Sequence, residues 1–156
     1  GDGVCDLPGW LGAGVPLTIG SDSQATRDWR EELRLLEYGQ RLTRRQRNIA
    51  AAPELGTPSS AERLAARMLS GCAAASGQAA WGLVPGARAD ALAVDRRADA
   101  LIGVVPERSL DALVFSSPGA PWRDVMVAGR WVLRDGVHPA AAAIAASFAA
   151  ALGDLG

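Results

Sequence analysis

The sequence lacks the features that mark several large classes of protein. It contains no lysine, because all sixteen basic residues are arginine, and seventeen acidic residues bring the net charge to −1. This near-balance gives no reason to expect nucleic acid or an anionic membrane as a partner. No apolar run reaches the length of a membrane span, and the alanine-rich stretch 140–152 favours a core or surface helix.

With two cysteines and one histidine, the chain has little material for a metal site of its own. Cys5 and Cys72 lie far apart and form no C-x-x-C motif, which argues against a disulfide framework and a zinc knuckle and favours a cytoplasmic setting. His138 follows the last predicted strand and is interpreted as a surface-loop residue, since a catalytic zinc usually takes about three protein ligands. No G-x-G-x-x-G or P-loop motif is present. Taken alone, the chain has no complete catalytic constellation.

The sequence does contain enough apolar material for a folded core, with 49% hydrophobic residues over 156 positions. The first half has the order of α/β proteins. We expect a helical turn over 7–11, a strand over 15–19 buried on both faces, a helix over 28–46, and a helix over 61–75 that ends at Gly77. Asp28 with Glu31, and Ser59 with Glu62, have the spacing of capping boxes.

The second half reads as mostly β. Short apolar runs separated by Gly, Pro and Asp predict strands over 91–95, 110–115, 125–127 and 131–133. Ala128-Gly129 predicts a hairpin with a type I′ turn and a positive φ at Gly129. We therefore divide the chain into 1–77, 78–138 and a C-terminal helical segment, 139–156. The chain opens in what reads as a loop, Gly1-Asp2-Gly3, without an initiator methionine or a signal peptide, so we expect further sequence upstream.

One charged cluster allows two interpretations. Arg41, Arg44, Arg45 and Arg47 could bind phosphate. Nearby acidic residues (Glu31, Glu32 and Glu37) favour instead a solvated helix face, with Glu37 and Arg41 paired at i,i+4.

Asp22 is the candidate functional residue. It follows the predicted buried strand and Gly20, among polar neighbours Ser21, Ser23 and Gln24. If the strand belongs to a parallel barrel, Asp22 lies at its C-terminal end, where barrel enzymes place catalytic groups. A carboxylate there can bind a metal and accept a proton from water. The alternative is that Asp22 caps the next helix or holds a turn.

The segments around Asp22 resemble a known enzyme family. Gly20-Ser21-Asp22-Ser23-Gln24, the stretch 31–42 (EELRLLEYGQRL) and 45–48 (RQRN) resemble the formimidoylglutamate deiminases of the amidohydrolase superfamily. The segments 83–95 and 125–136 resemble the β-sandwich segment that amidohydrolases carry beside the barrel. The resemblance covers nearly the whole chain and identifies it as a C-terminal fragment.

The resemblance implies an α/β fold: the last strand and helices of an incomplete (β/α)8 amidohydrolase barrel, part of the β-sandwich, and a C-terminal helix. It implies that Asp22 ends the eighth strand, binds zinc, and takes a proton from the zinc-bound water that attacks the formimino carbon. The substrate would be the small molecule N-formimidoyl-L-glutamate, converted to N-formyl-L-glutamate and ammonia in histidine degradation. The complete enzyme would be a cytoplasmic homodimer.

The same resemblance places the other metal ligands upstream of Gly1, so we expect the chain alone to be inactive. Ser23 and Gln24 lie near the site without an assigned role. Two alternatives stay open, namely another amidohydrolase such as an aminopyrimidine or guanine deaminase, and a β-rich module without chemistry.

Overall fold

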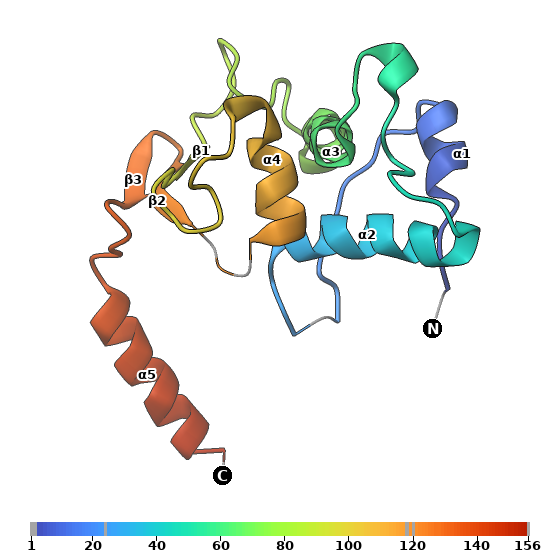
Figure 1. Ribbon diagram of the computed structural model, residues 1–156. Helices are drawn as coiled ribbons and strands as arrows, with labels where there is room; N and C mark the ends of the chain where they lie inside the picture. Colours follow the sequence, from blue (N-terminus) through green and yellow to red (C-terminus); the bar gives the residue numbers. More distant parts are fainter. Residues whose placement is uncertain (1–2, 24, 118, 120, 156) are drawn as a thin grey trace.

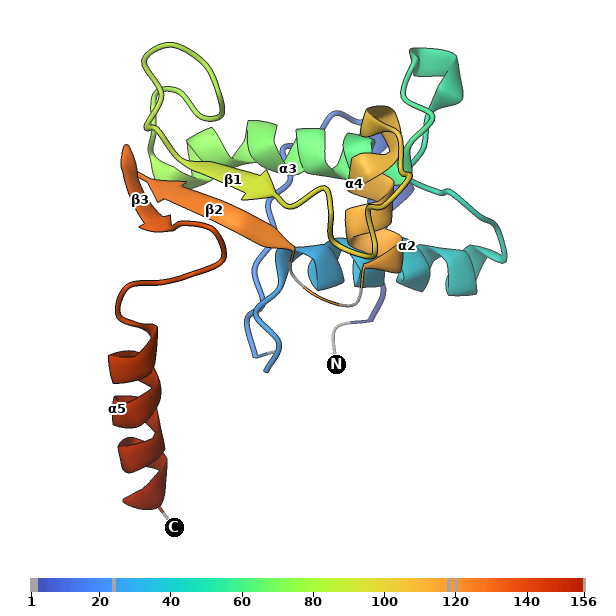
Figure 2. The same cartoon turned by 60° about the vertical axis from the view of Figure 1, so that its left-hand side comes forward.

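The computed structural model describes residues 3–23, 25–117, 119 and 121–155. Figures 1 and 2 show a group of helices beside a small sheet, with the last helix extending away from both. Gly1 and Asp2 of the predicted opening loop, and Gln24 of the candidate site, lie outside the described residues.

The helices of the first half form where their capping signals predict them. The elements are α1 (Leu7–Gly12), α2 (Trp29–Arg44), the 3-10 turn η1 (Pro53–Leu55) and α3 (Ser60–Ser76). The Asp28 carboxylate accepts a hydrogen bond from the Arg30 backbone N–H at 3.0 Å, and the Ser59 hydroxyl accepts one from the Glu62 N–H at 3.0 Å. The helix α3 ends at Gly77, whose φ of +66° is left-handed. The predicted helices are confirmed, with Asp28 and Ser59 as N-caps and Gly77 as the end of α3.

The hydrophobic core lies between these helices. Its buried members are Leu7, Leu11, Leu33, Ala50, Ala61, Leu64 and Val114. Six of the seven come from the first half of the chain, and Val114 comes from a segment that returns to pack on α2. Residues from the predicted segment 78–138 thus complete the core of the preceding segment. The division into 1–77, 78–138 and 139–156 stays a prediction.

The predicted strand over 110–115 is wrong. After the 3-10 turn η2 (Pro106–Arg108), the chain forms the short helix α4 (Ser109–Asp111), which continues into a π-helical turn, η3 (Ala112–Ser116). The Asp111 carboxylate accepts from the Ser59 hydroxyl at 2.8 Å, while Val114 is fully buried in the core. Residues three positions apart lie on the same face of a helix but on opposite faces of a strand. A helix therefore allows Asp111 to contact Ser59 while Val114 packs in the core.

The predicted strand over 15–19 is also absent from the described structure. A strand needs a neighbour to pair its backbone groups, and no described segment supplies one. Leu17 and Ile19 still pack against the core as half-buried side chains, whereas Val15 is 39% exposed. The backbone lies close to α3, since a Cβ added at Gly71 would be 2.2 Å from the Leu17 carbonyl oxygen. Gly71 is therefore required for this close approach.

The sheet is antiparallel, in the order β1 (Ala91–Val94), β2 (Trp122–Val127), β3 (Arg130–Leu133). Ala128 (φ +49°) and Gly129 (φ +78°) connect β2 to β3, which confirms the predicted hairpin and the positive φ at Gly129. The Ala128 N–H donates to the Asp90 carboxylate at 2.7 Å, so the turn is fastened to the start of β1.

The final helix, α5 (Ala141–Gly153), confirms the predicted terminal helix but buries none of its residues. It projects from the sheet as a separate rod (Figure 2). Ile144, Phe148 and Leu152, spaced at i, i+4 and i+8, are each more than half exposed. Of the helices in the described residues, none has both the length and the apolar character needed to cross a membrane.

Candidate active site

Asp22 lies in an exposed turn between the segment 15–20 and α2. Its φ of +44° is left-handed, a conformation that aspartate and asparagine adopt more readily than most residues. Its carboxylate makes no hydrogen bond with any described residue. Because Asp28 caps α2, the alternative that Asp22 caps this helix is wrong. The other part of that alternative, that Asp22 holds a turn, agrees with its turn position and left-handed φ. What remains is a carboxylate in a turn with no structural partner in the described part of the chain.

The neighbours of Asp22 do not complete a metal site. Ser21 is half-buried and Ser23 is exposed, and neither side chain has a hydrogen-bond partner in the described structure. The same described residues contain no group of three His, Cys, Asp or Glu side chains that could hold a metal ion. His138 accepts a hydrogen bond at Nδ1 from the Ala140 N–H at 3.1 Å, a local contact after β3. By themselves, these residues do not fit a catalytic zinc.

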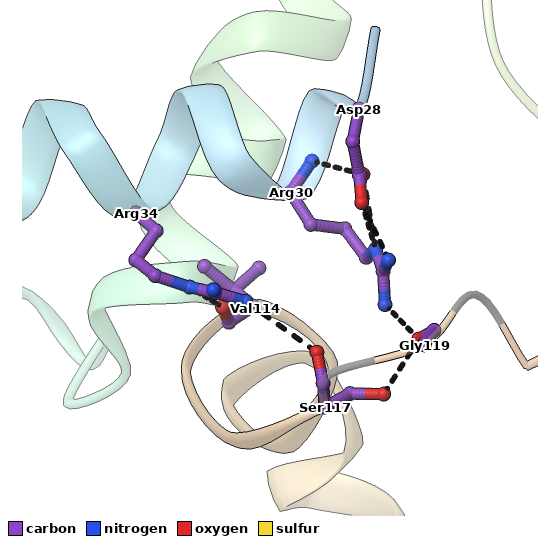
Figure 3. A network of polar contacts seen from close by, with 6 residues as sticks. All are labelled: Asp28, Arg30, Arg34, Val114, Ser117 and Gly119. Atoms are coloured by element: carbon purple, nitrogen blue, oxygen red, sulfur yellow. Dashed lines mark hydrogen bonds and ion pairs between the residues drawn. The ribbon is translucent and has the colours of Figure 1, made fainter. Parts of the chain in front are cut away.

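The start of α2, which follows the Asp22 turn, is anchored by a buried arginine. Arg30 is 3% exposed, and its Nε donates to both Asp28 oxygens at 3.0 and 3.1 Å. Figure 3 shows the guanidinium reaching on to the Gly119 carbonyl oxygen, in the loop that leads into β2. The hydrogen bond from Arg30 holds the pKa of the Asp28 carboxyl below its usual value.

Two further contacts fix the same region. Arg34 lies one helical turn beyond Arg30, and its Nε donates to the Val114 carbonyl oxygen at 2.7 Å (Figure 3). The Trp122 ring stacks on Trp29 with centroids 5.9 Å apart, and the Arg30 guanidinium lies 5.4 Å from the Trp122 ring centroid. The first two turns of α2 therefore join the helical core to the sheet.

Farther along α2, two more polar side chains are buried in structural roles. The Glu37 carboxylate, 2% exposed, accepts from the backbone N–H groups of Ile49 and Ala50 at 2.8 and 2.9 Å. The Gln40 amide, 1% exposed, donates to the Cys5 carbonyl oxygen at 2.6 Å. The predicted solvated pair of Glu37 with Arg41 is wrong, since Glu37 faces inward.

Sequence reasoning did not single out Arg30, Gln40 or the inward role of Glu37. Together with Leu33 they are the buried positions of α2, at spacings of 3, 4 and 3 residues. Polar residues at the core-facing positions of an amphipathic helix were the available signal.

A hollow of about 280 Å³ lies beside the segment that leads to Asp22. It is lined mostly by apolar side chains from α1, α2 and α3 and by residues 17–20. Asp22 is not among the lining residues, so the hollow is apolar packing space and not the candidate site itself.

Comparison with known proteins finds relatives along nearly the whole chain. A formimidoylglutamate deiminase from Pseudomonas aeruginosa is 40% identical over 155 residues, which cover 99% of this chain and 34% of that protein. The crystal structure of an amidohydrolase from Brucella melitensis matches with a TM-score of 0.86 and 34% identity, over 99% of this chain and 33% of that one. No protein-family model matches the chain.

These matches confirm the resemblance that the sequence motifs predict. The chain spans about a third of the length of both proteins. Over that third, the chain is similar in sequence to a formimidoylglutamate deiminase and has the fold of the corresponding part of an amidohydrolase.

Proposed function

We propose that the chain is the C-terminal part of a formimidoylglutamate deiminase, which hydrolyses N-formimidoyl-L-glutamate to N-formyl-L-glutamate and ammonia. The observation that carries this proposal is the 40% identity to such an enzyme over 99% of the chain. We further propose that the reaction belongs to histidine degradation in the cytoplasm and that the complete enzyme is a homodimer.

The proposal treats the segment 15–19 as the eighth strand of a (β/α)8 barrel whose other strands lie outside this chain. Two observations support it. The Leu17 backbone is held against α3 at Gly71, as a barrel strand is held against the outer helices. Beside it, the hollow of about 280 Å³ offers apolar packing space. Asp22 then stands just beyond the C-terminal end of the strand, on the face where barrel enzymes carry out catalysis.

In this arrangement Asp22 is the proton acceptor. Hydrolysis of a formimino carbon requires an attacking water to lose protons and the departing nitrogen to gain them. An exposed carboxylate with no competing hydrogen bond from the described residues can take a proton from the water and deliver it to the nitrogen that leaves as ammonia. Positioned proton transfer of this kind contributes roughly 10²–10⁴-fold to a rate.

We further propose zinc as the cofactor, with Asp22 as one ligand. A catalytic zinc takes about three protein ligands, and the described residues contain no group of three that could hold it. The other ligands must come from parts of the enzyme outside this chain.

Asp22→Asn in the complete enzyme tests the proposal, because asparagine keeps the shape of the side chain and tolerates the left-handed backbone. We expect kcat to fall by at least about 10²-fold with the fold intact. Asp135→Asn is the matched control, since Asp135 is also an exposed aspartate in a turn with positive φ (+49°). Near-normal turnover of Asp22→Asn, with metal still bound, would remove Asp22 from the mechanism.

Substrate preference separates the proposal from its alternatives. The complete enzyme should hydrolyse N-formimidoyl-L-glutamate in preference to aminopyrimidines and guanine. Preference for either base would reassign the protein to another deaminase of the amidohydrolase type, and no turnover of any of them would favour a module without chemistry.

A further inference from the structure

A second hollow, of about 340 Å³, lies on a different set of elements from the Asp22 turn. It is bounded by the second half of α2, the loop after it, the start of α3 and the segment 108–115. Its lining includes three arginines, Arg41, Arg47 and Arg108. Two of these belong to the cluster for which the sequence left phosphate binding open.

Several hydrogen-bond donors in this hollow have no acceptor in the described structure. The side chains of Arg47 and Asn48 make no hydrogen bond or ion pair with a described residue, and Arg41 only stacks over the Tyr38 ring at 4.8 Å. Ser60, the first residue of the 17-residue helix α3, is 5% exposed, and its Oγ is buried without a partner. A buried hydroxyl without a partner is unfavourable, so this one can still take a hydrogen bond.

The acidic residues of the hollow already have partners. Both Glu37 oxygens accept backbone N–H groups. Asp111 accepts from the Ser59 hydroxyl at 2.8 Å, from the Ala61 N–H at 3.3 Å and from Arg108 at 3.4 Å. Asp111 is paired with Arg108, and Arg41 and Arg47 have no ion-pair partner in the described residues, so the arginines of the lining outnumber its carboxylates by three to two. The first backbone N–H groups of α3 are already used, because Ala61 donates to Asp111 and Glu62 donates to Ser59.

We propose that this hollow binds a small dianionic oxyanion of the phosphate type. Arg41 and Arg47 supply charge and forked donors, Asn48 an amide donor, and Ser60 a hydroxyl donor. The site is built from residues 37–60 and 108–115, so it does not depend on the proposed deiminase activity.

Isothermal titration of the complete protein with inorganic phosphate at low ionic strength tests this site. We expect saturable binding, with acetate at least about tenfold weaker because it carries a single charge. Arg47→Gln should weaken phosphate binding by about tenfold or more, since it removes a charged hydrogen bond. Arg130→Gln, which alters an exposed arginine without a side-chain partner in the described residues, should leave binding unchanged.

Ser60→Ala separates ligand binding from a structural role. Removing a buried hydroxyl that has no partner among the described residues should leave the unfolding midpoint of the free protein unchanged or higher. It should nevertheless weaken phosphate binding by roughly threefold or more, because the bound anion loses a donor. Absence of saturable binding, equal binding of acetate, or equal effects of Arg47→Gln and Arg130→Gln would each overturn the proposal.

Discussion

Replacement of Arg30 by methionine is expected to loosen the junction between α2 and the sheet. Methionine keeps much of the apolar stem but removes the hydrogen bonds to Asp28 and Gly119 and the contact with the Trp122 ring. Breaking a buried ion pair costs about 3–5 kcal/mol. Asp28 is 27% exposed and keeps its bond from the backbone N–H of residue 30, which lowers the cost, while loss of the ring contact adds about 0.5–1 kcal/mol. We expect about 2–4 kcal/mol in total.

Hydrogen exchange of the complete protein, read by mass spectrometry, measures this cost locally. A loss of about 2–4 kcal/mol raises the local opening constant by roughly 30- to 1,000-fold. Peptides covering 29–36 and 122–127 should therefore exchange faster in Arg30→Met than in Arg27→Met. Arg27 is the matched control, because it is exposed and has no side-chain partner among the described residues. If both variants exchange alike in the 122–127 peptide, Arg30 does not hold this junction.

Three further outcomes are expected. Gly71→Ala should lower the unfolding midpoint by the equivalent of about 1–3 kcal/mol, because its Cβ would lie 2.2 Å from the Leu17 carbonyl oxygen. The control Gly12→Ala places its Cβ in open space and should leave the midpoint unchanged. Because the pKa of Asp28 is lowered in the folded state, its ionised carboxylate stabilises the fold above about pH 4, and this stabilisation is lost as the pH falls through the folded pKa. Asp28→Asn keeps an N-cap but cannot ionise, so its unfolding midpoint in thermal melts should fall less at acid pH than that of the unaltered protein. The 156-residue chain alone should neither turn over formimidoylglutamate nor bind one equivalent of zinc tightly, since the described residues contain no group of three His, Cys, Asp or Glu side chains that could hold it; turnover above background would contradict this.

The elements that were predicted correctly carry their signals within a few residues. Asp28 and Ser59 start helices by capping N–H groups two or three residues away, and Gly77 and Gly129 supply positive φ where a helix ends and a hairpin turns. Such signals act in any tertiary context, so sequence alone is sufficient to read them.

The elements that were predicted incorrectly depend on distant parts of the chain. The run 110–115 fits a strand or a helix equally well by pattern, and contacts of Asp111 with α3 and of Val114 with the core decide for the helix. The segment 15–19 has the composition of a central strand, but a strand forms only where a neighbour pairs with it. For 110–115 the deciding partners lie far away in sequence, and for 15–19 no described segment supplies the neighbour that a strand needs.

The residues that carry the resemblance to the deiminases differ from Asp22 in what their side chains do. The segment 31–48 carried much of the resemblance to the deiminases, yet Glu37 and Gln40 within it serve architecture, by holding backbone groups of Ala50 and Cys5. Such residues are constrained by the path of the chain, so they report common descent of the fold more directly than common chemistry. Asp22 shows the opposite pattern, since its side chain holds nothing in the described structure and sits in a left-handed turn. A carboxylate without a partner among the described residues is free to act on a ligand, so the catalytic role within the deiminase proposal is assigned to Asp22, while the proposal itself rests on the 40% identity over 99% of the chain.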